Sequence, residues 1–333
     1  MSKYSRRMLV TGGAGFIGSH LADRLVEEGH DVFVIDNEST GDRENLPRYV
    51  HFTKGDVSRV TDLEPLFAAG LDGVFHIAGQ VSMIRSFTDP VSDLKTNTHG
   101  TVNVLQMCLK YRVPRLLYAS SMTVYGHTDV LPTSEHERCQ PESYYGITKY
   151  AAERYVNVTA ARRDLDFDFH VTSFRMYNVY GPRQALDNPY QGVLGIFLGN
   201  VLRGEPITIF GDGEQSRDFI YIDDVVRAWV GALWNPSSYR TILNLGSGQR
   251  LTINRLADCV LAAFGHARSD WPVVYLAPRP GEQRHVEAGL CTTQQVLEWR
   301  PQVTFSAGLE KTVRWALAQN LSRPPAASSQ IGA

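Results

Sequence analysis

Short apolar runs alternate with helix-forming stretches through the first half of the chain. The apolar runs have the composition of strands that are buried on both faces, as in parallel sheets. They predict strands at residues 7–10, 31–35, 51–54, 73–77, 115–119 and 170–175. Helices are predicted between them at residues 15–28, 60–68, 93–111 and 145–163. Strands that alternate with helices form right-handed βαβ crossovers, so we expect an α/β fold with a Rossmann-like, doubly wound parallel sheet.

This alternation stops near residue 176. Turn-forming residues cluster at 181–182, 188–189 and 211–213, and further helices are predicted at 253–264 and 306–319. We therefore expect a first domain of residues 1–175 and a smaller C-terminal α/β lobe of residues 176–320. The lobe is expected to pack on the carboxyl edge of the sheet and to return some segments to the first domain. Residues 321–333 hold few bulky apolar side chains and are expected to form a disordered tail.

A glycine-rich turn follows the first predicted strand. Gly12, Gly15 and Gly18 are spaced as GxxGxxG. In such a turn the first glycine makes the tight bend, the second lets the backbone approach a phosphate, and the third allows close packing of helix on strand. The N-terminus of the following helix offers free N–H groups to a pyrophosphate. A plain structural turn is the alternative, but the strand–turn–helix context favours dinucleotide binding.

Asp36 ends the second predicted strand. A carboxylate there accepts hydrogen bonds from ribose hydroxyls and repels a 2′-phosphate, so the sequence favours NAD over NADP. A turn or cap aspartate is the alternative for Asp36. Asp56 and Val57 follow the third predicted strand, where contact with the adenine of the cofactor is plausible. A purely structural role for Asp56, in the loop that leads into the next helix, is a nearly equal alternative. The other positions expected to contact NAD are Phe16, Ile17, Asn37, Ala78, Gln80 and Asn97.

Tyr145 and Lys149 are separated by four residues on a predicted helix, so both side chains lie on one face. An ammonium next to a phenol lowers the pKa of the phenol, and Lys149 is also expected to hold the nicotinamide ribose. Tyr145 is therefore the candidate general base. The strand at 115–119 runs into Ser120 and Ser121, which places hydroxyls at the carboxyl edge where ligands bind. Simple turn chemistry is the alternative for these serines.

Composition and charge narrow the classes of partner. The chain has 333 residues with 43% hydrophobic and 20% charged residues, as in ordinary globular proteins. Its net charge is −2 and its basic residues form no stripe, so nucleic acid is not an expected partner. The four cysteines form no CxxC, so neither a disulfide framework nor a metal site is expected. No apolar run reaches membrane-spanning length, and a cytoplasmic location is expected.

Together these residues resemble the extended short-chain dehydrogenase/reductases, specifically the NAD-dependent nucleotide-sugar epimerase/dehydratase family. The likeness covers roughly residues 6 to 320 and adds four ordered motifs. These are HIAG at 76–79, NTHG at 97–100, RMYNVYGPR at 175–183 and GDGEQSRDF at 211–219. Gly79 departs from the usual HxAA of the family, which is expected to affect packing of the cofactor loop.

The resemblance implies that Ser121 is the catalytic serine, with Thr123 as a further catalytic candidate. In the 4,6-dehydratases of the family the next two positions are Asp-Glu, and in its UDP-glucuronate decarboxylases the second is a glutamate. Here they are Met122 and Thr123, neither of which acts as an acid at neutral pH. The resemblance therefore implies epimerisation rather than dehydration or decarboxylation.

By the same resemblance, the substrate is a UDP-sugar. Asn178, Arg217 and Arg284 are expected at its diphosphate. The segment 191–194, with Val193, is expected to contact uracil, and Phe210 to border the base. The other substrate contacts expected are Ser82, Arg85, Ser121, Met122, Tyr145 and Arg183. Arg85 and Arg183 are expected to be solvated or to face a phosphate, and attraction of a hexuronate carboxylate is the alternative for both. Val286 leaves room for an N-acetyl group.

The resemblance thus implies a UDP-hexose 4-epimerase that acts through a 4-keto intermediate. A UDP-glucuronate 4-epimerase or a UDP-N-acetylhexosamine 4-epimerase is the alternative, and a dehydratase, a decarboxylase or a non-catalytic NAD-binding regulator is less favoured. Relatives pair two helices per subunit in a homodimer, and the corresponding segments are 93–111 and 145–163. One side of the second segment carries Tyr150, Ala151, Arg154, Tyr155 and Val158, a pattern compatible with a partner helix or with intrachain core.

Overall fold

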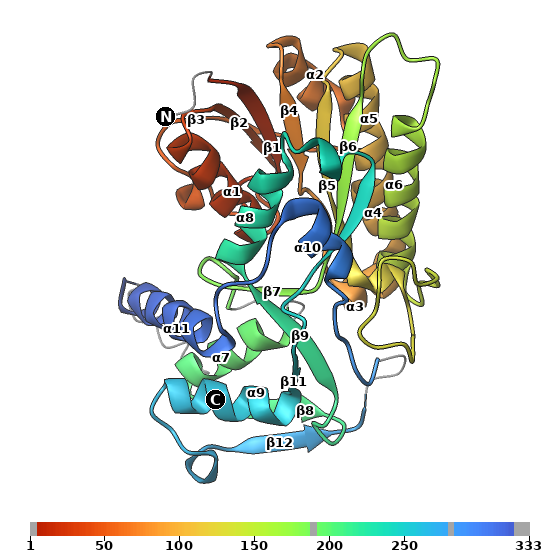
Figure 1. The fold of residues 1–333 in the computed structure, drawn as a ribbon. Helices are drawn as coiled ribbons and strands as arrows, with labels where there is room; N and C mark the ends of the chain where they lie inside the picture. The colour runs from red at the N-terminus through yellow and green to blue at the C-terminus, as the bar shows by residue number, and fades with distance from the viewer. Residues whose placement is uncertain (1–4, 187–191, 279–282, 323–333) are drawn as a thin grey trace.

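A seven-stranded parallel sheet dominates the computed structural model, which describes residues 5–186, 192–278 and 283–322 (Figure 1). In spatial order its strands are β10 (Thr241–Leu245), β6 (His170–Met176), β5 (Arg115–Ser121), β4 (Gly73–His76), β1 (Arg7–Thr11), β2 (Asp31–Asp36) and β3 (Val50–Lys54). The chain leaves β1 toward β2 on one side and later returns to β4 on the other. This reversal creates a crevice at the carboxyl ends of the strands.

The predicted doubly wound α/β fold is confirmed, and its six predicted strands are present. The seventh strand, β10, was not predicted, because its short sequence TILNL lies where the alternation of strands and helices has stopped.

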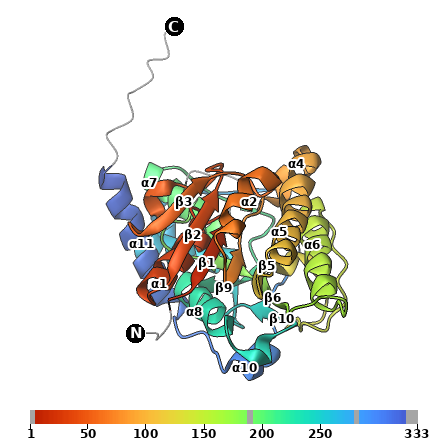
Figure 2. The same ribbon diagram turned by 90° about the horizontal axis from the view of Figure 1, so that it is seen from above.

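The strands are apolar on both sides because helices cover both faces of the sheet. Met8 and Val10 of β1 join a core with α1 (Phe16–Glu27) and α8 (Ile222–Ala232). Leu9, between them, points to a second core with α2 (Val60–Ala68), α5 (Gly100–Lys110) and α6 (Tyr144–Ala160). Figure 2 shows the two groups of helices on opposite sides of the sheet. All three β1 residues are fully buried, as the two-residue period of a strand requires.

The helical segment predicted at 93–111 is interrupted by a wider turn. It consists of α4 (Pro90–Leu94), the π-helical turn η2 (Lys95–His99) and α5. Asn97 lies in this π turn and is 1% exposed. Such turns often occur at functional sites, because they change the direction of side chains without breaking the helix.

The second half of the chain forms a smaller lobe below the carboxyl edge of the sheet (Figure 1). It contains a sheet of β11 (Arg250–Thr252), β9 (Ser216–Tyr221) and β7 (Asn178–Tyr180), and a pair of β12 (Val273–Leu276) and β8 (Ile207–Phe210). Its helices are α7 (Val193–Arg203), α9 (Ile253–Ala263) and α11 (Phe305–Ser322). From the same half, β10, α8 and α10 (Cys291–Leu297) pack with the large sheet.

Shorter helices complete the described structure. They are α3 (Met83–Thr88), η1 (Arg43–Asn45), η3 (Met122–Val124), η4 (Pro236–Ser238) and η5 (Arg268–Asp270). Within the described ranges, no helix is long and apolar enough to cross a membrane. Of the predicted C-terminal tail, residues 323–333 lie outside the described residues.

A buried ion pair fastens α6 to β6. Arg175 donates to both carboxylate oxygens of Glu153, at 2.7 and 3.0 Å, and both side chains are almost inaccessible to solvent. Ser120 donates to the same carboxylate at 2.6 Å, and the Arg175 guanidinium lies 4.7 Å from the centre of the Tyr125 ring. Two buried charges are tolerated here because their hydrogen bonds are made.

Removal of Glu153 is therefore expected to destabilise the protein strongly. Glu153→Ala leaves the Arg175 charge buried without its counterion, which costs about 3–5 kcal/mol of unfolding free energy. Urea unfolding followed by circular dichroism measures this change. Glu310→Ala is the matched control, because Glu310 forms a solvent-exposed pair with Arg314 and its loss is expected to change nothing measurable. Equal effects of the two variants would contradict the prediction.

Candidate active site

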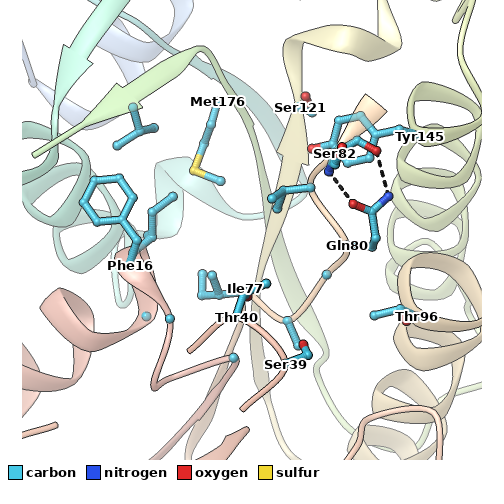
Figure 3. A pocket seen from close by; sticks show the side chains of 18 of the residues that line it. Phe16, Ser39, Thr40, Ile77, Gln80, Ser82, Thr96, Ser121, Tyr145 and Met176 are labelled. Atoms are coloured by element: carbon cyan, nitrogen blue, oxygen red, sulfur yellow. Dashed lines mark hydrogen bonds between the residues drawn. The ribbon is translucent and has the colours of Figure 1, made fainter. Parts of the chain in front are cut away.

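A cavity of about 480 Å³ lies between the carboxyl edge of the sheet and the smaller lobe. Residues of both halves of the chain line it. The sequence-predicted residues in its wall are Gly12, Gly15, Phe16, Ile17, Gly18, Asp36, Asn37, Asp56, Val57, Ala78, Gln80, Ser82, Arg85, Ser121, Tyr145 and Asn178. Figure 3 shows Phe16, Ile77 and Thr40 near one end of the cavity and Ser82, Ser121 and Tyr145 toward the other. The structure thus brings both predicted motifs to one cavity.

The glycine-rich turn has no room for side chains. Gly12 has φ +67°, and a Cβ there would lie 2.8 Å from the backbone of Ala78. A Cβ on Gly18 would lie 2.2 Å from the Gly12 carbonyl oxygen. Helix α1 then begins at Phe16 with Gly15 as its N-cap, and among the described residues no side chain caps it. Its first N–H groups therefore face the cavity as an anion site, which fits a pyrophosphate.

Asp36 is held by the same turn. Its carboxylate accepts hydrogen bonds from the backbone N–H of Ala14 at 3.0 Å and of Glu38 at 2.7 Å. Burial raises the pKa of Asp36, and these hydrogen bonds oppose the rise. A carboxylate has about four acceptor positions, so Asp36 keeps capacity for the hydroxyls of a ribose at the cavity wall. Asn37 donates to Asp56 at 3.1 Å at this end of the cavity. These residues fit NAD, and their individual contacts stay predictions.

Tyr145 and Lys149 lie on one buried face of α6. Helix α6 begins at Tyr144, and the Ser143 side chain caps it by accepting the Gly146 N–H at 3.0 Å. Tyr145 is 9% exposed and hydrogen-bonds with Ser121. The Thr123 hydroxyl in turn donates to the Ser121 oxygen at 3.0 Å. Three hydroxyl groups therefore form a chain that ends at the cavity.

Burial shifts the pKa values of both Tyr145 and Lys149. Burial raises the pKa of Tyr145 to about 12, and the hydrogen bond with Ser121 opposes the rise. The net shift is upward because loss of hydration outweighs the neighbouring groups, and the lowering of this pKa by Lys149 stays a prediction. Burial also lowers the pKa of Lys149 to about 8, while Asp93 and then Glu153 oppose this. The Lys149 ammonium lies 4.9 Å from the centre of the Tyr118 ring.

Several predicted site residues lie behind the cavity wall. Lys149, Thr123 and Asn97 are not among the residues that line it. Thr123 and Asn97 support lining residues, since Thr123 donates to Ser121 and Asn97 accepts the Gln80 backbone N–H at 2.8 Å. At Gly79, a Cβ would lie 3.0 Å from the Asn97 side-chain oxygen and 3.5 Å from the Lys149 nitrogen. The glycine at this unusual position therefore leaves space between the cofactor loop and Lys149.

Two predicted substrate contacts also lie just outside the wall. Met122 packs against a buried apolar cluster that contains Tyr177 and Val286. Val193 begins α7, and its neighbours Gly192 and Leu194 line the cavity instead. Gln191, in the same predicted uracil segment, lies outside the described residues.

Three predicted arginines bind protein groups rather than the cavity. Arg183 pairs with Asp23 at 2.6 Å, and Arg217 donates to the carbonyl groups of Ser216 and Gln283. Arg284 makes two hydrogen bonds to Asp212, at 2.7 and 2.8 Å. Phe210, on β8, is likewise not among the described residues that line the cavity. The structure does not bring these four residues to the other predicted site residues, and their substrate contacts stay predictions.

The structure adds cavity residues that the sequence did not reveal. Ser39 and Thr40 follow β2, and Met176 ends β6, so the rule that ligands bind at carboxyl ends contains a signal for them. Ser92 and Thr96 lie on α4 and in the π turn, and no sequence pattern marks them. Their place depends on how this helical segment crosses the crevice.

Comparison with known proteins agrees with this geometry. Residues 8–246 match the NAD dependent epimerase/dehydratase family. Over 318 residues the chain is 37% identical to the UDP-glucose 4-epimerase of Mycolicibacterium smegmatis, covering 93% of this chain and 98% of that protein. The chain belongs to the NAD dependent epimerase/dehydratase family. The predicted resemblance is thereby confirmed.

Solved structures of UDP-glucose 4-epimerases have the same fold as this family member. The enzyme of Thermotoga maritima, solved with UDP-glucose, is 38% identical with a TM-score of 0.89, and the match covers 95% of this chain and 99% of that one. The Thermus thermophilus enzyme, solved with NAD, is 35% identical with a TM-score of 0.85, and the match covers 93% and 99%.

In this member of the epimerase/dehydratase family, Gly18→Ala is expected to weaken NAD binding. The added methyl group collides with the Gly12 carbonyl and displaces the turn that faces the pyrophosphate. We expect about tenfold or greater loss of NAD affinity, equivalent to at least ~1.4 kcal/mol, measured by calorimetry after removal of bound cofactor. Gly231→Ala is the control, because Gly231 is also helical but has nothing within 4 Å of its Cβ position. Unchanged affinity in Gly18→Ala would refute the role of the turn.

Proposed function

We propose that this protein is a UDP-hexose 4-epimerase of the UDP-glucose/UDP-galactose type with tightly bound NAD. The observation that carries the proposal is the meeting of Tyr145 and Ser121 with the glycine-rich turn in one cavity. The solved relatives with UDP-glucose and with NAD support the choice of substrate and cofactor.

Tyr145 is the proposed general base. NAD, when bound, accepts the hydride from C4 of the sugar and returns it, and its positively charged ring favours the phenolate. Tyr145 takes the proton of the 4-hydroxyl while Ser121 hydrogen-bonds the same oxygen. Thr123 orients the Ser121 hydroxyl through its own hydrogen bond. Tyr145 then gives the proton back after the 4-keto sugar has turned its other face.

The residues after Ser121 favour this outcome over elimination. The Met122 side chain packs against the apolar cluster near Tyr177, and the Thr123 hydroxyl donates to Ser121. Neither side chain is an acid at neutral pH, so neither replaces the acidic pair of the dehydratases or the glutamate of the decarboxylases. The residues at these two positions therefore favour hydride return.

Arg85 supports a second candidate, a UDP-glucuronate 4-epimerase. This arginine lines the cavity close to Ser82, so a cation is available for a hexuronate carboxylate. Arg183, the other predicted cation, already pairs with Asp23. Val286 is 5% exposed within the cluster that contains Met122, so an N-acetyl group gains space only if this cluster yields. A neutral hexose requires neither a cation for a carboxylate nor space for an N-acetyl group.

A panel of UDP-sugars tests the function. We expect the protein, purified with its NAD, to interconvert UDP-glucose and UDP-galactose at least ~10-fold more efficiently than UDP-glucuronate or UDP-N-acetylglucosamine. Proton NMR of the anomeric signals measures each reaction. Preference for UDP-glucuronate would select the second candidate. Bound NAD without isomerisation of any nucleotide sugar would favour a non-catalytic regulator.

Tyr145→Phe serves as the control for this assay. It removes the proton acceptor and keeps the ring, so kcat is expected to fall about 100- to 10,000-fold while the unfolding transition barely changes. Near-wild-type turnover in this variant would exclude Tyr145 as the base.

We further propose that the protein is a homodimer formed through the segments 93–111 and 145–163, which contain the end of α4, the π turn, α5 and α6. Helices α4, α5 and α6 lie side by side at one end of the molecule (Figure 2). On α6, Tyr155 and Val158 are 53% and 57% exposed, and on α4 Val91 and Leu94 are 73% and 53% exposed. On the side of α6 that the sequence marked, Arg154, Tyr155 and Val158 are exposed in the described chain, while Tyr150 and Ala151 are half-buried. Exposed apolar side chains of this kind favour a partner surface.

Val158→Glu is expected to dissociate this dimer. Two like charges near the pairing axis oppose association, and we expect about tenfold or greater weakening. Light scattering after size-exclusion chromatography measures the mass as a function of concentration. Val274→Glu is the control, because Val274 is also an exposed valine but lies on β12 of the other lobe. A wild-type protein with the mass of one chain would contradict the proposal directly.

A cytoplasmic location remains part of the proposal. All four cysteines are free thiols in the structure, which is compatible with a reducing compartment.

A further inference from the structure

A buried carboxylate lies behind the cavity wall, and the proposed chemistry does not use it. Asp93, near the end of α4, is 0% exposed. One of its oxygens accepts the Gln80 side-chain amide at 2.7 Å and the Asn97 amide at 3.1 Å. The other accepts the Thr148 hydroxyl at 2.6 Å. Three donors from three segments therefore converge on one carboxylate, as a buried charge requires.

These hydrogen bonds connect the loop after β4, the cofactor loop, to α6, the helix that carries Tyr145 and Lys149. Gln80 belongs to the loop after β4 and contacts the backbone of Ser82 through both ends of its amide group (Figure 3). Asn97 also holds the Gln80 backbone, donating to its carbonyl at 3.1 Å and accepting its N–H at 2.8 Å. Thr148 immediately precedes Lys149 on α6. The π turn places Asn97 where it reaches both Asp93 and the loop.

Asp93 also acts on the catalytic pair through its charge. Among the groups that raise the pKa of Lys149, Asp93 comes first and Glu153 second. Asp93 also raises the pKa of Tyr145. The other titratable groups that face these residues are His76 on β4, Tyr118 on β5 and Asp89, which caps α4.

We propose that Asp93 is a positioning residue of the active site: its carboxylate joins the cofactor loop to α6 and holds a negative charge behind Tyr145 and Lys149. The proposal rests on the function proposed above, in which Tyr145 works as phenolate beside charged Lys149. A hydrogen-bonding role alone would need only a polar side chain. A role through charge predicts a further effect, because the charge of Asp93 changes the pH range in which Tyr145 and Lys149 are active.

The test is the pH dependence of kcat/KM in the Asp93→Asn holoenzyme. The two limbs of the profile report the ionisations of the Tyr145–Lys149 pair. A negative neighbour raises both pKa values, so its removal is expected to move both limbs to lower pH, by about one unit. Activity at the alkaline end should then fall about tenfold more than activity at the acid end. A loss by the same factor at every pH would overturn the charge role.

Three variants separate charge from structure. Asp93→Glu keeps the charge and is expected to keep the position of both limbs. Thr148→Val removes the hydroxyl that donates to Asp93 and accepts from Asn97, without a change of charge, and is expected to lower activity equally across the pH range. Asp89→Asn removes an exposed charge from the same helix and retains a good capping residue, so its profile should match the wild type. If Asp93→Asn does not fold, Asp93→Ser takes the same test with a smaller side chain.

A readout without substrate keeps this inference separate from the proposed function. Competitive labelling of Lys149 with acetic anhydride, followed by mass spectrometry, gives the pKa of its amine in the purified protein. This pKa is expected to be about one unit lower in Asp93→Asn. Equal values in wild type and variant would overturn the inference even if the enzyme isomerises UDP-glucose. A wild-type protein with no epimerase activity would reject the proposed function, while the labelling still decides the role of Asp93.

Discussion

The common direction of the seven strands is the constraint on which the site depends. Parallel strands end at one edge, so the residues that follow β1, β4 and β5 meet there although they are far apart in sequence. Gly12, Ala78 and Ser121 come from these three strand ends, and α6 brings Tyr145 to the same place. Backbone contact between Gly12 and Ala78 makes the approach so close that a side chain at the glycine has no space.

Burial is the second determinant of the chemistry. Water is largely excluded from Tyr145 and Lys149, and each is therefore biased toward its neutral form. The catalytic pair works against this bias, so it needs charges and hydrogen bonds at fixed positions. Ser121 supplies the hydrogen bond to Tyr145, and Asp93 supplies the charge near Lys149. Stability and activity are thus linked, because the groups that tune the pair also hold α6 against the sheet.

Local patterns in the sequence were enough to predict much of this arrangement. The apolar runs gave six strands, the glycine spacing gave the turn after β1, and the four-residue spacing placed Tyr145 and Lys149 on one face. What could not be predicted depends on distant partners. Arg284 meets Asp212 across 72 positions, and no local pattern records that pairing. The direction of the Tyr145 pKa shift depends on burial by the whole fold, and Asn97 in the π turn has its partner in the loop after β4.

The cavity wall has one consequence for metabolism. Residues from the β1 turn form one side, and Asn178, Gln184 and Leu194 from the second half of the chain contribute to another. In the proposed function, a dinucleotide seated between them is retained through both halves of a reaction that removes a hydride and restores it. Such a catalyst consumes no reducing equivalents, and its equilibrium position is independent of the cellular ratio of NADH to NAD. The flux through it then follows the two sugar concentrations alone.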